Sequence, residues 1–288
     1  MDIYGIAEKA GVSIATVSRV LNDDIHVSEA TRRKVLRAME QTGYVPNAFA
    51  RSLGRGAMKA VGLLCPDAND PYQASALAHL ESAFRSRGYG CSLICTGSTA
   101  LDRTEGLRAM RLLKVDALVL MGSAFSDLDA RGTRLLETIA RERPVLMLNA
   151  QSEVPETYSI RCDDRGATRE AVLRLAARGC RRILYLYHSG SRSGREKLAG
   201  YREALEQSGI TPDERLVRMA GEDGDMDQIL LALERLRDEG VLFDAVMTSR
   251  DQLAVAAVKH CLRHGLRVPE DVCVIGYDDL ALCRCCEP

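Results

Sequence analysis

Small and polar side chains share one face of a short segment near the N-terminus, "AGVSIATVSRVLN" at residues 10–22. On a helix that begins at Ile14, a rotation of about 100° per residue places four further side chains within the next ~140°. These are Ala15, Ser18, Arg19 and Asn22. Small side chains let a helix backbone enter a DNA major groove, and an arginine can reach a guanine edge or a phosphate. The segment therefore predicts a helical face that reads DNA.

Two short helices position this face. Residues 3–10 carry apolar side chains at helical spacing, Gly11 ends that helix, and Ser13 is a suitable N-cap for the next one. The inner side of the second helix is expected to consist of Val17, Val20 and Leu21. Two helices joined by a tight turn that contains glycine predict a helix-turn-helix. The alternative is a helical cap that only packs on the rest of the protein.

A third helix completes the predicted head. Ser28 is a second N-cap candidate, and Gly43 is suited to end the helix. Its inward side chains are expected to be Val35, Leu36 and Met39.

After Lys59 the sequence alternates between apolar strands and helices. Strands are predicted at 60–67, 90–97, 116–123 and 144–150, with helices near 74–87, 103–113 and 130–142. A second set of strands is predicted at 158–163, 182–188, 215–221, 244–249 and 271–279. Continuous apolar strands that alternate with helices predict parallel sheets covered on both faces. The two sets predict two lobes.

Polar residues end many of these strands. In open α/β sheets ligands bind at the carboxyl ends of strands, and a crevice between two lobes is a favoured place. The residues are Asp67, Ser123, Asn149, Asp163, His188, Arg250, Asp251, Asp278 and Asp279. Each alone could equally cap a helix or lie in a loop. Their shared position predicts a pocket for a small ligand.

Other clusters offer less chemistry. "GSRSG" at 190–194 resembles a nucleophile elbow, but its central residue is Arg192 and not serine, and no phosphate-binding glycine motif follows a strand. His260 and His264 are one turn apart on a predicted helix, yet no glutamate or further ligand stands nearby at metal spacing. "CRCC" at 283–286 lacks a second pair at zinc-site spacing. We therefore expect no catalytic residues, no metal and no cofactor.

The composition indicates a globular protein with a basic head. The 288 residues are 46% hydrophobic and 27% charged, and this length suggests about two domains. Residues 1–60 hold nine Lys/Arg against six Asp/Glu, whereas the remainder holds 30 against 34, so the head suits a polyanionic partner. The ten cysteines are expected to be buried and reduced. Without a signal peptide or an apolar run of membrane length, we expect a soluble cytoplasmic protein.

The head resembles that of the lactose-repressor and galactose-repressor (LacI/GalR) family of bacterial transcription regulators. The resemblance rests on "IAEKAGVSIATVSRVLN" and "VSEATRRKVLRAMEQTGYVPNAFARSLGRG". It implies that Ile14, Ala15 and Arg19 face bases. It implies phosphate contacts for Ser13, Thr16, Ser18, Asn22, His26 and Tyr44. Ile14 and Ala15 occupy the two positions that vary with the operator sequence in the family.

The segment "PNAFARSLGRG" at 46–56 resembles the family's hinge helix. A helix from Asn47 to about Leu53 is too short to be stable alone, but it can fold when paired with a second copy on DNA. The resemblance implies that Leu53 wedges into a minor-groove base step with Ala50 beside it. The alternative is a linker leucine that packs on its own protein.

The body from residue 60 onward resembles the same family's effector domain, which is similar to periplasmic sugar-binding proteins. "DPYQA", "CDDRGA", "GREKLAGYREAL", "TSRDQLA" and "GYDDL" carry this resemblance. It implies a candidate set of effector-binding residues: Tyr72, Asp163, Arg195, Lys197, Arg250, Asp251 and Asp278. Lys197 stands where the family usually has arginine, and Arg250 replaces a common asparagine.

The residue types suggest two kinds of effector. Carboxylates that accept hydrogen bonds from hydroxyls suit a sugar or another polyol. Arg250 together with Lys197 would also allow an anionic sugar derivative, unless Arg250 pairs with Asp251 or Asp278. A sugar-derived metabolite is therefore the expected effector.

The predicted organisation is a helix-turn-helix domain at 1–45, a hinge helix and linker at 46–59, and a two-lobed effector domain at 60–288. The lobes are placed at about 60–157 and 158–288. Because the family continues for several strands and helices after "GYDDL", we expect the C-terminal end of this chain to be truncated. The predicted function is a ligand-responsive repressor that binds a pseudo-palindromic operator as a homodimer. The alternative is a cytoplasmic sugar-binding sensor without a DNA role, and we expect no enzymatic activity.

Overall fold

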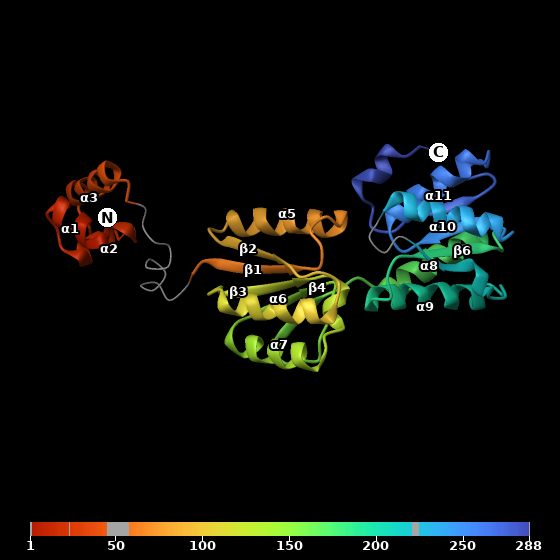
Figure 1. The fold of residues 1–288 in the computed structure, drawn as a ribbon, viewed down its shortest axis with the longest axis horizontal. Coiled ribbons are helices and arrows are strands. Elements are labelled where there is room, and N and C mark those ends of the chain that lie inside the picture. The colour runs from red at the N-terminus through yellow and green to blue at the C-terminus, as the bar shows by residue number, and fades with distance from the viewer. Residues whose placement is uncertain (1, 23, 45–57, 221–224, 288) are drawn as a thin grey trace.

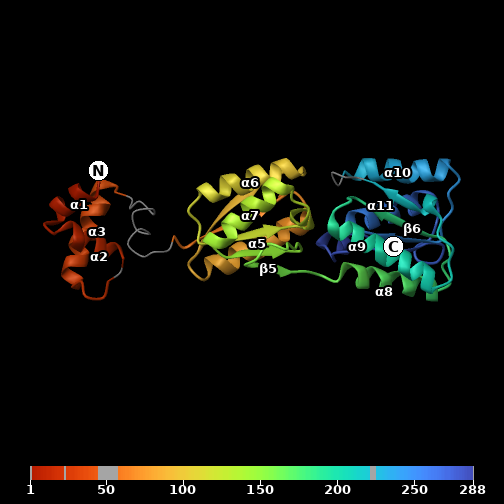
Figure 2. The ribbon, with the colours of Figure 1, turned by 90° about the horizontal axis from the view of Figure 1, so that it is seen from below.

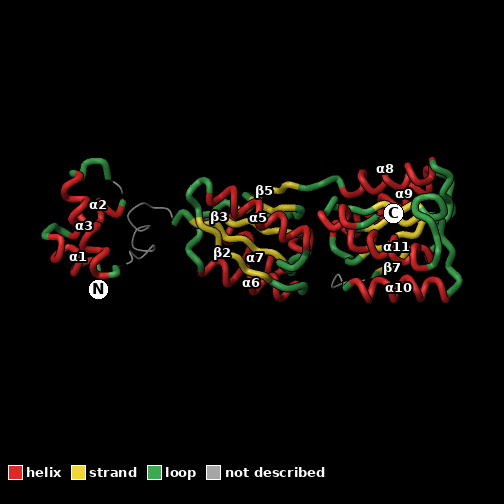
Figure 3. The backbone as a smooth tube through the Cα atoms, turned by 90° about the horizontal axis from the view of Figure 1, so that it is seen from above, coloured by secondary structure: helices red, strands yellow, loops and turns green. Residues whose placement is uncertain are grey.

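The computed structural model describes residues 2–22, 24–44, 58–220 and 225–287. It shows a helical head followed by two α/β lobes that lie end to end (Figures 1 and 2). Figure 3 shows the strands at the centre of each lobe, with helices on both sides. The predicted fold class, an N-terminal helix-turn-helix followed by two lobes with parallel sheets, is confirmed. The predicted hinge helix lies outside the described residues.

The head consists of α1 (Ile3–Ala10), α2 (Ile14–Leu21) and α3 (Glu29–Thr42). Gly11 ends α1 with a φ of 65°, a left-handed conformation that glycine adopts without strain. The hydroxyls of Ser13 and Ser28 accept hydrogen bonds from the backbone N–H groups of Thr16 and Thr31. These caps satisfy N–H groups at the start of α2 and α3 that have no partner within the helix. The cap predictions are confirmed.

The core of the head contains side chains from all three helices. They are Ile6, Ala7, Val17, Val20, Val35 and Ala38. Leu36, which was expected to face inward, is 49% exposed. That prediction is wrong because Val35, Ala38 and Met39 follow the spacing of one helical stripe, and Leu36 lies about 100° away from Val35.

The first lobe surrounds a five-stranded parallel sheet with the order β2-β1-β3-β4-β5. Its strands are β1 (Ala60–Cys65), β2 (Gly90–Cys95), β3 (Ala117–Met121), β4 (Val145–Leu148) and β5 (Thr157–Ile160). Its helices are α5 (Pro71–Arg85), α6 (Ala100–Leu112) and α7 (Ala130–Glu142), with a short 3-10 helix at Ser123–Ser126. Side chains on one face pack with α5, and those on the other face pack with α6 and α7. Leu63 and Leu64, adjacent in β1, belong to opposite faces.

The second lobe surrounds a four-stranded parallel sheet with the order β7-β6-β8-β9. Its strands are β6 (Ile183–Tyr187), β7 (Val217–Met219), β8 (Ala245–Thr248) and β9 (Cys273–Ile275). Its helices are α8 (Asp164–Ala177), α9 (Arg192–Gln207), α10 (Met226–Asp238) and α11 (Asp251–Arg263), with 3-10 helices at Glu214–Leu216 and Ala281–Cys285. One face packs with α8 and α9, and the other packs with α10 and α11.

The strand predicted at 158–163 does not open the second lobe. It is β5, at Thr157–Ile160, and it pairs with β4 at the edge of the first sheet. The predicted lobe boundary between 157 and 158 therefore lies within this strand. A short loop instead brings β5 alongside β4, so the first sheet extends to Ile160.

The burial of the cysteines and the apolar character of the helices are two further properties of the described residues. All ten cysteines are free thiols, but only Cys65, Cys180 and Cys261 are buried, so the expectation that the cysteines as a group are buried is wrong. Among the described residues, no helix combines the length and the apolar character that a membrane crossing requires.

Candidate functional site

The first candidate site is the outward face of α2. Ile14 is 40% exposed, and Ala15 and Arg19 are exposed beside it. Val17 and Val20, on the opposite side of the helix, are buried in the core of the head. The apolar side fixes the helix on the head and leaves the other side open. This face has the size and polarity that entry into a major groove requires.

The other residues that were predicted to contact DNA differ in how exposed they are. Ser13 and His26 are exposed, and Thr16, Ser18 and Asn22 are half-buried. Tyr44 is half-buried and packs against the core of the head. Asn47, Ala50 and Leu53 lie outside the described residues.

The second candidate site is a pocket between the two lobes. A cavity of about 90 Å³ is lined by side chains from both sheets and their helices. Its lining includes Asp70, Tyr72, Asn149, His188, Lys197 and Asp278. An adjoining cleft of about 990 Å³ shares part of this lining and is large enough for a small metabolite. Of the nine polar residues predicted at strand ends, six line this pocket or the cleft: Asp67, Ser123, Asn149, His188, Arg250 and Asp278. Asp163, Asp251 and Asp279 do not line either of them.

Among the described residues, three polar side-chain contacts cross this pocket region from one lobe to the other. Arg250 forms an ion pair with Asp70. Arg195 Nη2 lies 2.7 Å from Asp127 Oδ1, and Ser123 Oγ donates to Ser191 Oγ at 2.9 Å. The guanidinium groups of both arginines, which were predicted to contact an effector, thus hold the lobes together in this structure.

Lys197 lies in the wall of the pocket and is 6% exposed. Its Nζ donates to the carbonyl oxygen of Ser249 at 3.0 Å, lies 3.9 Å from Asp164 Oδ1, and is 3.5 Å from the centre of the Tyr277 ring. Burial lowers the pKa of Lys197, while the carboxylates of Asp278 and Asp164 oppose that shift. The aromatic ring and the carboxylate stabilise a cation in this position.

The loop "GYDDL" turns its first aspartate toward the pocket. Asp278 has a positive φ of 104° and is solvent-accessible at the cleft. Displacement of water by the surrounding protein raises the pKa of Asp278 to about 6, although Lys197 opposes the shift. Asp251 is 2% exposed, and its Oδ2 accepts a hydrogen bond from the backbone N–H of Leu280 at 2.6 Å. Asp251 therefore positions the loop and does not line the pocket.

Two adjacent aspartates after β5 have different roles. Asp163, the predicted effector ligand, is exposed and caps α8 by accepting a hydrogen bond from the Gly166 N–H at 2.9 Å. Asp164 is buried and accepts a hydrogen bond from the Tyr277 hydroxyl at 2.7 Å. Asp163 is therefore a helix cap, as the alternative interpretation allowed. The carboxylate that lies near Lys197 in the pocket wall belongs to its neighbour, Asp164.

Asp70 lines the pocket without having been predicted from the sequence, and His188 was predicted only as a polar residue at a strand end. Asp70 caps α5, and its position after a turn gave no signal of a contact with Arg250. His188 follows β6, as several polar residues follow strands, and its Nδ1 lies 3.0 Å from Ser249 Oγ. Burial lowers the pKa of His188 to about 3, and the nearby Arg250 and Lys197 add to the shift, so its imidazole is neutral near pH 7.

Comparison with known proteins gives two matches to family models. Residues 2–47 match bacterial regulatory proteins of the lacI family, and residues 172–288 match a periplasmic binding protein-like domain. An HTH-type transcriptional regulator of Lachnoclostridium phytofermentans (strain ATCC 700394 / DSM 18823 / ISDg) is 40% identical over 289 residues, which cover 100% of this chain and 86% of the relative.

Two solved structures are similar over almost the whole chain. The lac repressor dimer bound to operator and the anti-inducer ONPF has a TM-score of 0.84 and 27% identity, and the match covers 98% of this chain and 83% of that one. A complex of the transcriptional regulator CelR with cellobiose has a TM-score of 0.67 and 31% identity, covering 100% and 86%. The order of the two matched domains, the exposed face of α2 and the identity to a curated regulator lead to one conclusion: this chain belongs to the LacI family of bacterial DNA-binding transcription regulators.

Proposed function

We propose that this chain is a repressor that binds a pseudo-palindromic operator as a homodimer and responds to a sugar or a sugar derivative bound between its lobes. The observation that carries the proposal is the presence, in one chain, of an outward polar face on α2 and a polar pocket lined by both lobes. We assign the helix-turn-helix to residues 1–45, the hinge and linker to 46–59, and the effector domain to 60–288.

In this proposal α2 lies in the major groove. Arg19 contacts a base edge, and Ile14 and Ala15 contact bases at the positions that set operator preference. The surrounding side chains bind phosphates: Ser13, Thr16, Ser18, Asn22, His26 and Tyr44. Asn47, Ala50 and Leu53 belong to a hinge helix that enters the minor groove, and a pair of such helices requires a dimer.

The effector is proposed to contact polar groups from both lobes. Asp278, Asn149 and His188 offer acceptors and donors for hydroxyl groups, and the ring of Tyr72 offers a stacking surface. A relative, CelR, has been solved with cellobiose, which is consistent with a sugar as the ligand class here. Because Arg250 pairs with Asp70, its charge is already neutralised, which favours a neutral sugar over an anionic one.

Coupling between the two sites would act through the contacts that join the lobes. An effector that binds one lobe arrangement more tightly than another shifts the population toward that arrangement. The Arg250–Asp70 and Arg195–Asp127 pairs bridge the lobes, so a change in lobe spacing must lengthen or break them. The change would reach the paired hinge helices and alter the affinity for the operator.

The experiment that tests the proposal is fluorescence anisotropy of the full chain on a pool of short palindromic duplexes and scrambled controls, repeated over a salt series. We expect salt-dependent binding with a preference for one palindrome. Mono- and disaccharides added to the preferred complex should then change the affinity in one direction for the effector and have no effect for other sugars.

Two outcomes would contradict the proposal. Equal binding to palindromic and scrambled duplexes would exclude sequence-specific operator recognition by this chain. Sugar binding without any affinity for DNA would favour the alternative of a sugar-binding sensor. Sedimentation of the complex tests the dimer separately, because a single copy on each palindrome would contradict homodimeric binding.

A further inference from the structure

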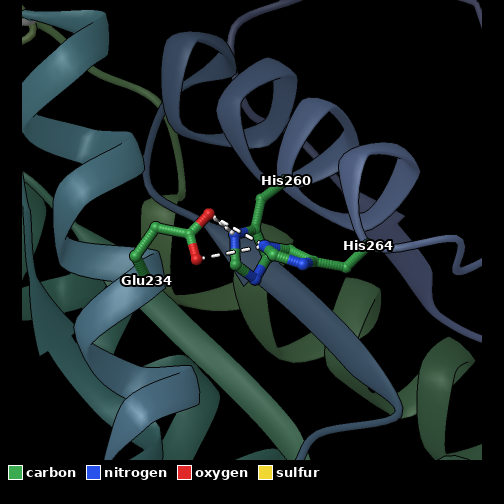
Figure 4. Close-up of side chains that lie close together, drawn as sticks. All are labelled: Glu234, His260 and His264. Carbon is green, nitrogen blue, oxygen red and sulfur yellow. Dashed lines mark hydrogen bonds and ion pairs between the residues drawn. The ribbon is translucent and has the colours of Figure 1, made fainter.

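Two imidazoles and a carboxylate meet on the second lobe, away from the inter-lobe pocket. Glu234 comes from α10, His260 comes from the last turns of α11, and His264 is the residue that caps the C-terminal end of α11 (Figure 4). His260 Nδ1 lies 3.2 Å from Glu234 Oε1, and His264 Nε2 lies 2.9 Å and 3.0 Å from the two carboxylate oxygens. One ligand atom from each residue lies within 4.8 Å of the other two.

The packing of α10 against α11 produces this cluster. The two histidines are four residues apart, so they project from the same side of α11, and their ring centres are 4.6 Å apart. Leu233, beside Glu234, is buried in the same core as Cys261. The sequence expectation of no nearby glutamate fails because Glu234 precedes the histidines by a strand and a loop. The third ligand is close only in the folded lobe.

This set of atoms suits a transition-metal ion. Two imidazole nitrogens and one carboxylate oxygen, with one position left for water, form a common zinc-type site. At metal–ligand distances of about 2.0–2.1 Å, tetrahedral ligands lie roughly 3.3 Å from one another. The separations of 2.9 Å and 3.2 Å between the carboxylate and the imidazoles are close to that spacing. The ligand atoms of the two histidines also lie within 4.8 Å of each other, so a modest adjustment of the side chains would bring all three ligands to that spacing.

The burial of the three side chains is also suitable for binding a metal ion. The His260 side chain is 3% exposed and is held in place by the core, whereas the side chains of His264 and Glu234 are 24% and 34% exposed. The cluster therefore has one fixed ligand and an open side through which an ion and a water molecule can enter. The positive charge of Arg237, on α10, is one of the smaller contributions that lower the pKa of His260.

We propose that Glu234, His260 and His264 bind one divalent transition-metal ion of the zinc type, with water as the fourth ligand. The ion links α10 to α11 and stabilises the second lobe. Because α11 begins at Asp251, His260 lies about 14 Å along the helix from the end that faces the cleft. The site is therefore separate from the proposed effector pocket. The competing interpretation is a triad held only by hydrogen bonds.

The test is a titration of the full, reduced and chelator-treated chain with Co²⁺, which reports its coordination in the visible spectrum, followed by competition with Zn²⁺. We expect one equivalent to bind with the absorption of tetrahedral cobalt and to be displaced by Zn²⁺. His264→Gln and Glu234→Gln should each weaken this binding by about 100-fold or more, since even outer changes around such ligands cost 10–100-fold. His79→Gln, which removes an exposed histidine from α5, should leave it unchanged.

The same spectra distinguish metal binding by cysteine thiolates from binding by the proposed site. A thiolate-to-cobalt charge-transfer band that disappears in a Cys283→Ser, Cys285→Ser, Cys286→Ser variant would place the ion at the C-terminal cysteines and overturn the proposal. Retained binding in folded His264→Gln and Glu234→Gln would overturn it as well. The absence of stoichiometric binding would leave the hydrogen-bonded triad as the role of these residues. Circular dichroism establishes that each variant is folded, and a Zn²⁺-dependent rise in Tm of the unmodified chain would support the link between helices.

Discussion

The head and the inter-lobe pocket are built in opposite ways. The outward face of α2 comes from a single helix, and each of its side chains is within nine residues of the others. The pocket collects residues from Asp70 to Asp278, and neither lobe alone provides its full lining. A local pattern therefore determines the first site, whereas the second depends on the placement of two complete sheets.

This difference affects how a charged side chain functions at each site. Arg19 is exposed on the head and remains available to a partner. In the pocket, Arg250 and Arg195 pair with carboxylates of the opposite lobe, and Lys197 contacts a carbonyl, a carboxylate and an aromatic ring. The same residue type is left exposed in one region and joins the two lobes in the other.

The largest expected effect concerns the core of the head. Val17→Asp would bury a carboxylate among apolar side chains, with a cost of about 3–5 kcal/mol, which is comparable to the whole stability of so small a core. We expect the head to unfold and specific DNA binding to be lost, while the lobes remain folded. Hydrogen exchange of residues 2–44 measures the unfolding directly.

The matched control is Leu36→Asp, because Leu36 is 49% exposed. Its effect on the stability of the head should stay within about 0.5 kcal/mol. A loss as large as that of Val17→Asp would mean that Leu36 is covered in the working protein.

The next largest effect is expected at Lys197. Lys197→Met keeps much of the side-chain volume but removes the cation beside Asp164, and a buried carboxylate that loses its partner costs about 3 kcal/mol. Urea unfolding followed by circular dichroism should show a less stable second lobe. Lys259→Met, at an exposed position on α11, is the control and should change little. Equal stability of both variants would argue against an electrostatic role for the Lys197 charge.

A smaller effect is expected where the head meets DNA. Arg19→Ala should weaken binding to the preferred palindrome by about 1–3 kcal/mol, with little change on scrambled duplexes, if Arg19 contacts a guanine. Anisotropy over a salt series distinguishes this from a phosphate contact, which would give a uniform loss and a shallower salt dependence. Arg174→Ala removes an exposed arginine of α8 that pairs with Glu170, and it should bind DNA as the unmodified chain does.

The head was the more predictable region because its signals are local. Ser13, Ser28, Gly11 and Gly43 mark helix ends through their own backbone preferences, and all four positions agree with the structure. The wrong assignment of Leu36 concerns a residue that directly follows Val35 of the buried stripe and lies about 100° from it around α3.

The pocket was predictable in its location but not in its residue roles. Alternating strands and helices indicated where polar side chains gather, because the carboxyl ends of parallel strands lie on one edge. The pairing of Asp70 with Arg250 and the position of Glu234 beside two histidines depend on tertiary contacts between distant segments. The choice between Asp163 and Asp164 depends on the direction in which α8 leaves its cap, which composition does not encode.

The smallest expected effect concerns the pH dependence of stability that Asp278 produces in the pocket. Because the pKa of Asp278 is raised from 3.8 to about 6, the folded protein binds this proton more tightly than the unfolded chain does. The free energy of unfolding should therefore fall as the pH rises from about 4 to about 6. It should remain lowered at pH 7, where the Asp278 carboxyl is ionised and its burial carries a cost. Asp278→Asn removes that cost.

We expect Asp278→Asn to equal the unmodified chain near pH 4 and to be more stable at pH 7 by up to about 1 kcal/mol, since the cleft is open to solvent and screening weakens the effect. Urea unfolding of both proteins over this pH range measures the difference. His188 contributes a slope of the opposite sign, because its pKa is lowered to about 3, but it is present in both proteins and cancels. Parallel stability curves would mean that the Asp278 carboxyl is as well hydrated in the cleft as in the unfolded chain.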